Sequence, residues 1–284
     1  MDGTGINPPT TTHRPGPRVI AAVLTGALSF TLAHLLGGCE LEGIRPGADG
    51  LLSVIADTTP EEAAAWSIDP YDADKRYRGT LKLATYPFAG EPVYIKLFVD
   101  NIKDPDAGVR TAATRALGNH GGPEHVPLLV KSLQDEDKLV RAEGARALQR
   151  VHNLVAIPAL INAIDEAKEL EVDVRSEAAD ALGQYPDNRV VSELIKALAD
   201  PSLAVNYATL GSLRTLTGQD FGLDRAAWRK WVDSTKDAFA ARSAYVYPVF
   251  RRDRKFYEYL PMVPKPPNEP EGSSPVGMPP MDGR

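Results

Sequence analysis

Residues 104–118 read DPDAGVRTAATRALG, and the chain repeats this pattern at regular intervals. A related copy, DEDKLVRAEGARALQ, occupies residues 135–149. The valine of the Val-Arg step stands at Val109 and Val140, and later copies place a valine at Val174 and Val205. These positions are 31, 34 and 31 residues apart, and self-similarity at such a period indicates an architecture of stacked repeats.

Each copy has the pattern of two amphipathic helices. In the second copy, Val126, Leu129, Val130 and Leu133 have the i, i+3, i+4, i+7 spacing of one helix face. An acidic turn at 135–137 ends this helix, and a second helix is expected over 139–151. Small residues recur along the second helices, where they let neighbouring helices approach closely: Ala113, Gly144, Ala178 and Thr209, then Ala116, Ala147, Ala181 and Ser212. The sequence therefore predicts stacked helical hairpins joined by short turns.

These copies resemble HEAT repeats of the short type, also called PBS-lyase-like. The motif residues are an Asp, a Val-Arg step, and an Ala-Leu-Gly step, seen here at Asp104, Val109-Arg110 and Ala116-Leu117-Gly118. The resemblance implies an all-α fold, a right-handed α-solenoid of the armadillo/HEAT type. It also implies a ladder between repeats, to which these residues correspond: Asp104, Asp135 and Asp200 with Arg110, Arg141 and Arg175. Asn206 stands where the fourth copy would carry its Arg, so the last rung departs from the pattern.

The repeat array sets the expected division of the chain. Arg76 lies 34 residues before Arg110, and Leu83 lies 34 before Leu117, which indicates a degenerate first repeat. The expected segments are a signal peptide at 1–38, a tether at 39–59, N-terminal helices with the degenerate repeat at 60–90, and repeats at 91–218, divided as 91–122, 123–153, 154–187 and 188–218. A capping helix at 219–242, an extended aromatic and basic strap at 243–260 and a disordered Pro-rich tail at 261–284 complete the division.

The N-terminus has the features of an export signal. Arg14 and Arg18 precede an apolar run at 19–36, as in a secretory signal peptide. Leu36-Gly37-Gly38-Cys39 resembles a bacterial lipobox, which implies cleavage before Cys39 and lipid attachment to that residue. The alternatives are an uncleaved membrane anchor, since 18 apolar residues can just span a bilayer, and an ordinary signal peptide with a chance cysteine. Interpreted as a lipobox, this stretch predicts a lipoprotein on the periplasmic side of a bacterial cell envelope.

The C-terminal part has one clear helix start. Asp224 is a good N-cap for a helix over 225–242, and Trp228 and Trp231 lie on one face of that helix. Tryptophans at this spacing predict a hydrophobic lid on the last repeat. Basic residues between aromatics at 251–259 are interpreted as a strap that lies back along the solenoid.

The sequence carries no recognisable catalytic constellation. His120, His125 and His152 lie near turns without carboxylates at metal-ligand spacing, so solvated histidines are expected and no metal or cofactor is predicted. No phosphate-binding loop, nucleophile elbow or His-Glu step is present. A net charge of −6 argues against nucleic acid, and no small-molecule substrate is expected.

The hypothesis from sequence is a membrane-anchored HEAT-repeat scaffold that binds proteins and has no catalysis of its own. Its partner would contact the concave surface formed by the second helices, at positions chosen from helical phase: Thr111, Thr114, Arg115, Arg146, Asp180 and Tyr207. The alternatives are a HEAT-like enzyme, of the bilin lyase or iron-dependent hydroxylase type, and a purely structural envelope protein.

Overall fold

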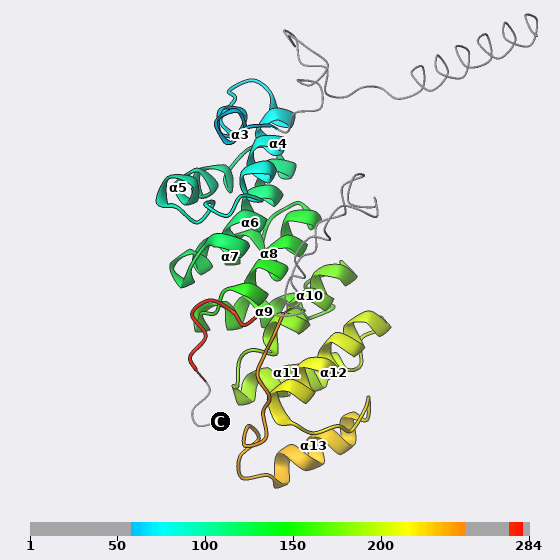
Figure 1. Ribbon diagram of the computed structural model, residues 1–284. Coiled ribbons are helices and arrows are strands. Elements are labelled where there is room, and N and C mark those ends of the chain that lie inside the picture. Colours follow the sequence, from blue (N-terminus) through cyan, green and yellow to red (C-terminus); the bar gives the residue numbers. More distant parts are fainter. Residues whose placement is uncertain (1–57, 248–272, 281–284) are drawn as a thin grey trace, which may run out of the picture. The chain divides into compact units, whose positions relative to one another are not determined.

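The computed structural model describes residues 58–247 and 273–280. In these ranges the regular structure is helical, with two isolated β-bridges and no longer strand, so the expected all-α fold is confirmed. Figure 1 shows the helices in chain order. The α-helices are α3 (Pro60–Ser67), α4 (Ala73–Leu83), α5 (Pro92–Asn101), α6 (Ala107–His120), α7 (Val126–Ser132), α8 (Lys138–Arg150), α9 (Ile157–Ala163), α10 (Val172–Leu182), α11 (Asn188–Ala197), α12 (Leu203–Thr217) and α13 (Arg225–Ser234).

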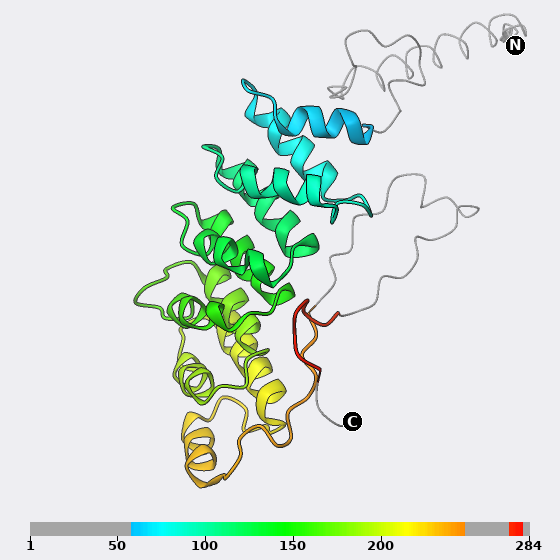
Figure 2. The same ribbon diagram turned by 90° about the vertical axis from the view of Figure 1, so that its left-hand side faces the viewer.

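Helices α3 to α12 form five consecutive hairpins that stack along one direction. Their second helices, α4, α6, α8, α10 and α12, pack side by side along the stack, whereas each first helix mainly contacts its own partner (Figures 1 and 2). This two-layer arrangement is an α-solenoid. The hairpin of α3 and α4 lies in the residues where the degenerate first repeat is expected, at 60–90.

The core lies between the two layers. One column of the first helices is fully buried at Phe98, Leu129, Leu160 and Leu194. The matching column of the second helices is also fully buried, at Leu117, Leu148, Leu182 and Leu213. Because every repeat buries its apolar stripe against its neighbours as well as within itself, the stack has one continuous core.

Aspartates cap the starts of the second helices α4, α6 and α8. Asp106 Oδ1 accepts the backbone N–H of Val109 (3.0 Å), and Asp137 Oδ1 accepts that of Leu139 (2.8 Å). Each carboxylate satisfies a free N–H of the first turn and lies at the positive end of the helix dipole. The acidic turns seen in the sequence are therefore helix starts.

Two first helices begin with a 3-10 turn, which the periodicity did not predict. The turns are η1 (Pro123–His125) before α7 and η2 (Leu154–Ala156) before α9. Pro127 and Pro158 follow these turns, and a proline has no N–H to donate one helical turn back. The α-helical hydrogen-bond pattern therefore starts later than expected in both repeats.

The last helix is shorter than the expected 225–242. Helix α13 ends at Ser234, and Thr235 has an extended backbone (φ −79°, ψ 143°). Ser234 Oγ donates to the carbonyl of Trp231, and Asp237 Oδ1 accepts the N–H of Phe239. These polar side chains stabilise the helix end and the turn that follows it, so the chain leaves the helix eight residues early.

The described part of the expected disordered tail is ordered, which corrects the prediction for residues 273–280. This segment lies beside residues 243–247 and against the stack (Figure 1, red and orange). Val276 N donates to the carbonyl of Arg150 and Val276 O accepts the N–H of His152, both at 2.8 Å. The prolines that suggested disorder are compatible with an extended backbone that pairs through its remaining amides.

Several predictions concern residues outside the described ranges. These are the signal segment with Cys39, the tether up to residue 57, the strap at 248–260 and the rest of the tail. Among the described helices, none is both long and apolar enough to cross a membrane.

Candidate protein-binding surface

An arginine ladder joins successive repeats. Arg110 donates from Nε and Nη2 to Asp135, both at 2.8 Å, and its Nη1 donates to the carbonyls of Asp104 and Pro105. Asp135 also accepts the backbone N–H of Asp137 (2.9 Å). A single guanidinium thus holds the turn of its own repeat and the turn of the next one.

The same geometry recurs on both sides of this rung. Arg76 Nε donates to Asp104 (2.7 Å), and Arg175 Nε donates to Asp200 (2.8 Å). In the third repeat the acid is Glu169, which Arg141 Nε contacts at 2.7 Å. Glu169 stands at the motif position, five residues before Val174, as Asp135 stands five before Val140. Glu169 was not predicted from the sequence because an aspartate was expected at that position.

The electrostatics of the ladder are those of a structural element. Burial by itself raises the pKa of Asp104, but the hydrogen bonds from Arg76 and from the N–H of Asp106 outweigh it and leave the pKa below its usual value. Hydrogen bonding to Asp135 raises the pKa of Arg110. The Arg76–Asp104 rung therefore stays ionised and paired across the physiological range.

The fourth copy has no rung among the described residues. Asn206 is buried in the place of the arginine, and its Oδ1 has no hydrogen-bond partner there. The departure noted in the sequence is thus a real end of the ladder.

The six positions proposed for the concave surface differ in accessibility. Thr114 is fully buried: its hydroxyl donates to the carbonyl of Arg110 and lies 2.9 Å from Ser132 Oγ on α7. The expectation that Thr114 is exposed was wrong, because a threonine hydroxyl can satisfy itself on its own helix and on the adjacent one. Thr111 is half-buried and also donates to its own helix, at Ala107.

Arg115 and Arg146 belong to a charged row across the second helices. Arg115 Nη2 donates to Glu143 (2.8 Å), and Arg146 Nε donates to Glu177 (2.8 Å). Gln149 Nε2 donates to the same Glu177 carboxylate (2.7 Å). These side chains pair with adjacent repeats, so they contribute to the stack as well as to its surface.

Asp180 and Tyr207 have opposite surroundings. Burial raises the pKa of Asp180 to about 6, and the negative charge of Glu177 acts in the same direction. Tyr207 is 63% exposed on α12. Tyr207 is therefore the proposed position that is most accessible to a partner.

The three histidines of the stack have partners, contrary to the expectation of solvated side chains. His152 is buried, lies 3.0 Å from Gln184 Oε1 and stacks on Tyr185. Burial lowers the pKa of His152, so its neutral form is favoured. His120 Nε2 lies 2.8 Å from the carbonyl of Ala84, and His125 Nδ1 accepts the N–H of Gly122. Within the described ranges, no group of three or more His, Cys, Asp or Glu is arranged to hold a metal ion.

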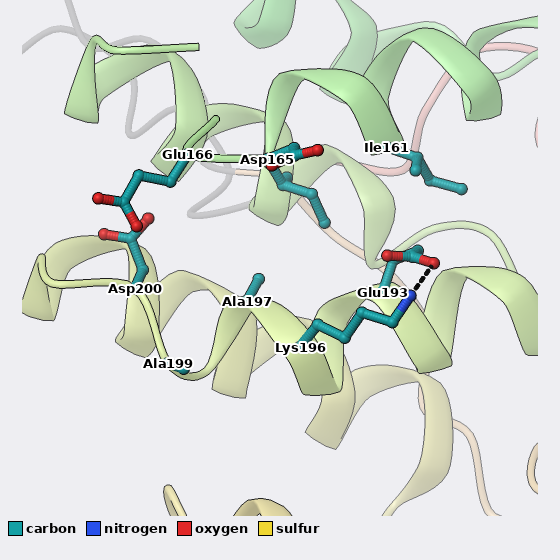
Figure 3. Close-up of a pocket in the computed structure, with 9 residues that line it drawn as sticks. Ile161, Asp165, Glu166, Glu193, Lys196, Ala197, Ala199 and Asp200 are labelled. Atoms are coloured by element: carbon teal, nitrogen blue, oxygen red, sulfur yellow. Dashed lines mark hydrogen bonds and ion pairs between the residues drawn. The ribbon is translucent and has the colours of Figure 1, made fainter. Parts of the chain in front are cut away.

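An acidic cleft of about 340 Å³ lies between α9 and α11 (Figure 3). Lys196 pairs with Glu193 (2.7 Å), and Arg175 pairs with Asp200 (2.8 Å). Glu166 points toward Asp200 in Figure 3 and has no ion pair among the described residues. The cleft thus has an excess negative charge at its edge.

Exposed apolar side chains continue from this cleft along the starts of the second helices. A depression connects the starts of α10 and α12. It is lined by Leu170, Val172 and Pro201 together with Glu166. An ion pair between Lys138 and Glu171 (3.6 Å) connects the starts of α8 and α10. We call this surface the apolar edge, and its members are Leu139, Leu170, Val172, Leu203 and Tyr207.

The apolar edge follows from repeat geometry. Leu203 and Tyr207 are four residues apart on α12, so their side chains lie on the same face. Leu139 and Val172 occupy the first turns of α8 and α10 and are exposed there. Large exposed apolar groups collected at one edge are typical of a protein-interaction surface.

Two protein-family models match the chain. The model for HEAT repeats matches residues 95–173, and the model for the PBS lyase HEAT-like repeat matches residues 174–200. Residues 95–200 of the stack are HEAT repeats. The matched residues run from Ile95 in α5 to Asp200, the acid of the last rung. The resemblance to HEAT repeats, stated from the motif residues, is confirmed.

Solved structures similar to this HEAT-repeat domain include natural and engineered proteins. One is the complex of CpcE and CpcF of phycocyanin lyase from Nostoc sp. PCC7120, with 23% identity, coverage of 61% of this chain and 80% of that chain, and a TM-score of 0.38. Another is an engineered protein with 20% identity, coverage of 63% and 90%, and a TM-score of 0.45. A designed armadillo repeat protein has 17% identity, coverage of 64% and 94%, and a TM-score of 0.43. No curated protein matches the chain.

Proposed function

We propose that this HEAT-repeat protein is a non-catalytic scaffold that is exported, is anchored to a membrane through a lipid on Cys39, and binds a protein partner along the apolar edge. The observation that carries the binding role is the exposure of the edge. Leu203 and Tyr207 are each 63% exposed, and Leu170 is 82% exposed. Burying one such leucine against a partner contributes about 1.5–3 kcal/mol, so a few of them suffice for a specific complex.

The charge around the apolar edge points to the chemistry of the partner. The ladder arginines neutralise Asp135, Glu169 and Asp200, and the edge lysines Lys138 and Lys168 are already paired with Glu171 and Asp165. The remaining charge is acidic, at the exposed Glu166 and Asp173, and at Glu136, which shares Arg110 with Asp135 (3.6 Å). The partner is therefore a protein segment with apolar side chains flanked by Lys or Arg.

The anchoring part of the proposal rests on the sequence. Cys39 is the single cysteine of the chain and follows Leu36-Gly37-Gly38, in the arrangement of a lipobox. A lipid on this residue would hold the scaffold at a membrane surface while its edge stays accessible to soluble or membrane-bound partners.

A pull-down from solubilised membranes tests the binding role, with Leu203→Asp as the variant and Val93→Asp as its matched control. Val93 is 64% exposed at the start of α5, away from the apolar edge, so both substitutions place a new carboxylate on an equally open site. We expect a reproducible partner with the wild-type chain and with Val93→Asp, and its loss with Leu203→Asp. Equal recovery with all three chains would remove the apolar edge from the interaction.

Metal analysis of the purified protein addresses the enzymatic alternative. A scaffold contains no stoichiometric iron after purification under anaerobic conditions. One iron per chain that copurifies with a hydroxylase activity would contradict the non-catalytic proposal.

A further inference from the structure

A short extended stretch follows α8. The helix ends at Arg150, and its C-cap Val151 (φ −126°, ψ 115°) and Asn153 (φ −160°, ψ 131°) are extended. In the following repeat the C-cap of α10, Gly183, keeps a helical backbone instead (φ −60°, ψ −12°). A backbone with strand-like angles presents N–H and C=O groups sideways, where another extended segment can pair with them.

Residues 273–280 of the same chain occupy this position. Val276 and Val151 form a parallel bridge, through the two hydrogen bonds of Val276 to Arg150 and His152. Ser273 makes a second pair, in which its N–H and C=O bond to Tyr247 at 3.1 and 3.0 Å. This is the geometry of strand addition, in which main-chain bonds hold a peptide and side-chain positions select its sequence.

The surroundings of three positions in the segment restrict which residues fit there. Pro275 is buried. Gly277 has φ +82°, and a Cβ there would clash with Pro123 Cγ and lie 3.2 Å from the carbonyl oxygen of His152. Met278 lines an apolar cavity of about 170 Å³ whose walls include Leu154, Leu216 and Tyr245. The site therefore accepts the pattern Pro-x-Gly-Met in an extended conformation.

The segment has few contacts, and the stack does not depend on it. Ser274, Val276, Gly277, Pro279 and Pro280 are exposed. The side chains beneath them have other partners, since His152 contacts Gln184 and Gln184 donates to the carbonyl of Leu148. Opening the segment breaks its backbone bonds to Arg150, His152 and Tyr247 and leaves the helices paired, so we expect a local opening that costs less than unfolding the domain.

We propose that the edge formed by Val151, His152 and Pro123 is a peptide-binding site, which residues 273–280 fill in the free protein. A partner protein that presents an extended Pro-x-Gly-Met segment displaces them and binds by the same main-chain bonds. The site lies at the ends of the second helices and not on the apolar edge, so its failure would leave the proposed function standing.

The test uses a fluorescent peptide with the sequence of residues 273–280 and the full-length chain in detergent. The Gly277→Val variant cannot dock its own segment, because valine opposes the positive φ and clashes with Pro123. If the native segment occupies the site about nine-tenths of the time, a variant whose segment cannot dock should bind the peptide with an apparent Kd about tenfold lower. Ser274→Ala, at an exposed position, should bind the peptide as weakly as the wild-type chain does.

Amide hydrogen exchange at His152 gives a second readout that does not depend on affinity. The amide should be protected in the wild-type chain, should exchange faster in Gly277→Val, and should regain protection when the peptide is added. The proposal is overturned if the peptide binds neither chain, if it binds wild type and Gly277→Val equally, or if a peptide with valine at the glycine position binds as well.

Discussion

At the scale of single residues, the ladder arginines are the buried charges of the stack whose loss should cost most. Arg175 and Asp200 are both almost fully buried, and the guanidinium also bonds to the carbonyls of Glu169 and Leu170. Removing one partner of such a pair leaves a buried charge without compensation, which costs about 3–5 kcal/mol.

Arg175→Ala is therefore expected to lower the free energy of unfolding by about 3–5 kcal/mol, measured by urea denaturation. Arg189→Ala is the matched control, because Arg189 pairs with Asp187 on an open surface. The control should denature at the midpoint of the wild type. A small effect of Arg175→Ala would mean that the rung is not a main support of the stack.

Asp180 gives a pH dependence with a definite sign. Its pKa is raised to about 6 from an ordinary 3.8, by burial first and by Glu177 second. The folded state therefore binds the proton more tightly than the unfolded state, and stability falls as the pH rises from about 4 to 6. Tyr245 lies near this carboxylate, and Asp180 and Arg150 both act on Tyr245.

Asp180→Asn should stabilise the protein at pH 8, by at most about 3 kcal/mol for a shift of two pKa units. The gain should shrink as the pH falls through 6 and vanish near 4, in thermal melts across this range. Asp233→Asn, at an exposed position of α13, serves as the control and should show no pH-dependent gain. A gain of Asp180→Asn that is independent of pH would exclude the carboxylate charge as its cause.

Residue-scale prediction from sequence succeeded where the motif itself specifies the contact. Arg110, Arg141 and Arg175 all make the ladder contacts that the resemblance implied. Thr114 was misplaced because helical phase alone does not show that a hydroxyl can be buried against the adjacent helix. Exposure of a small polar side chain depends on tertiary neighbours that the sequence does not name.

At the scale of helices, two glycines with different surroundings test the close packing. A Cβ on Gly144 of α8 would lie 2.7 Å from the backbone N of Leu133, so α7 would have to move. A Cβ on Gly211 of α12 would meet nothing within 4 Å. Gly144→Ala should destabilise by about 1–3 kcal/mol through overpacking, and Gly211→Ala should stabilise by about 0.5–1 kcal/mol through helix propensity.

Thermal unfolding of the two glycine variants, followed by circular dichroism, measures this difference. Both substitutions change glycine to alanine in the second helix of a hairpin, α8 or α12. The difference in intrinsic helix propensity between glycine and alanine therefore cancels when the two variants are compared. Equal effects of Gly144→Ala and Gly211→Ala would mean that α7 and α8 tolerate a wider separation than the structure has.

Helix boundaries could be predicted where a capping residue marks them. Asp224 begins α13, as its sequence pattern indicated, and accepts the N–H groups of Ala226 and Ala227. The starts of α7 and α9 and the end of α13 could not be read from periodicity, because prolines and local side-chain bonds decide them. The order of residues 273–280 depends on a pairing with residues more than a hundred positions away, which no local pattern shows.

At the scale of the whole molecule, the proposed lipid on Cys39 would hold the scaffold at a membrane. Cys39→Ala is expected to block processing and to release the chain from membranes into the soluble fraction, as judged by fractionation and mass spectrometry. If the variant is processed and sedimented like the wild type, Cys39 is not the lipid attachment site.

The most direct test of the scaffold account is site-specific photo-crosslinking in living cells, with the photoreactive residue at Tyr207 or at Val93. The two positions are almost equally exposed, at 63% and 64%, and lie on different parts of the stack. The account predicts one discrete crosslinked protein from position 207 and none from position 93. No crosslink from position 207, or the same products from both positions, would contradict a protein-binding role for the apolar edge.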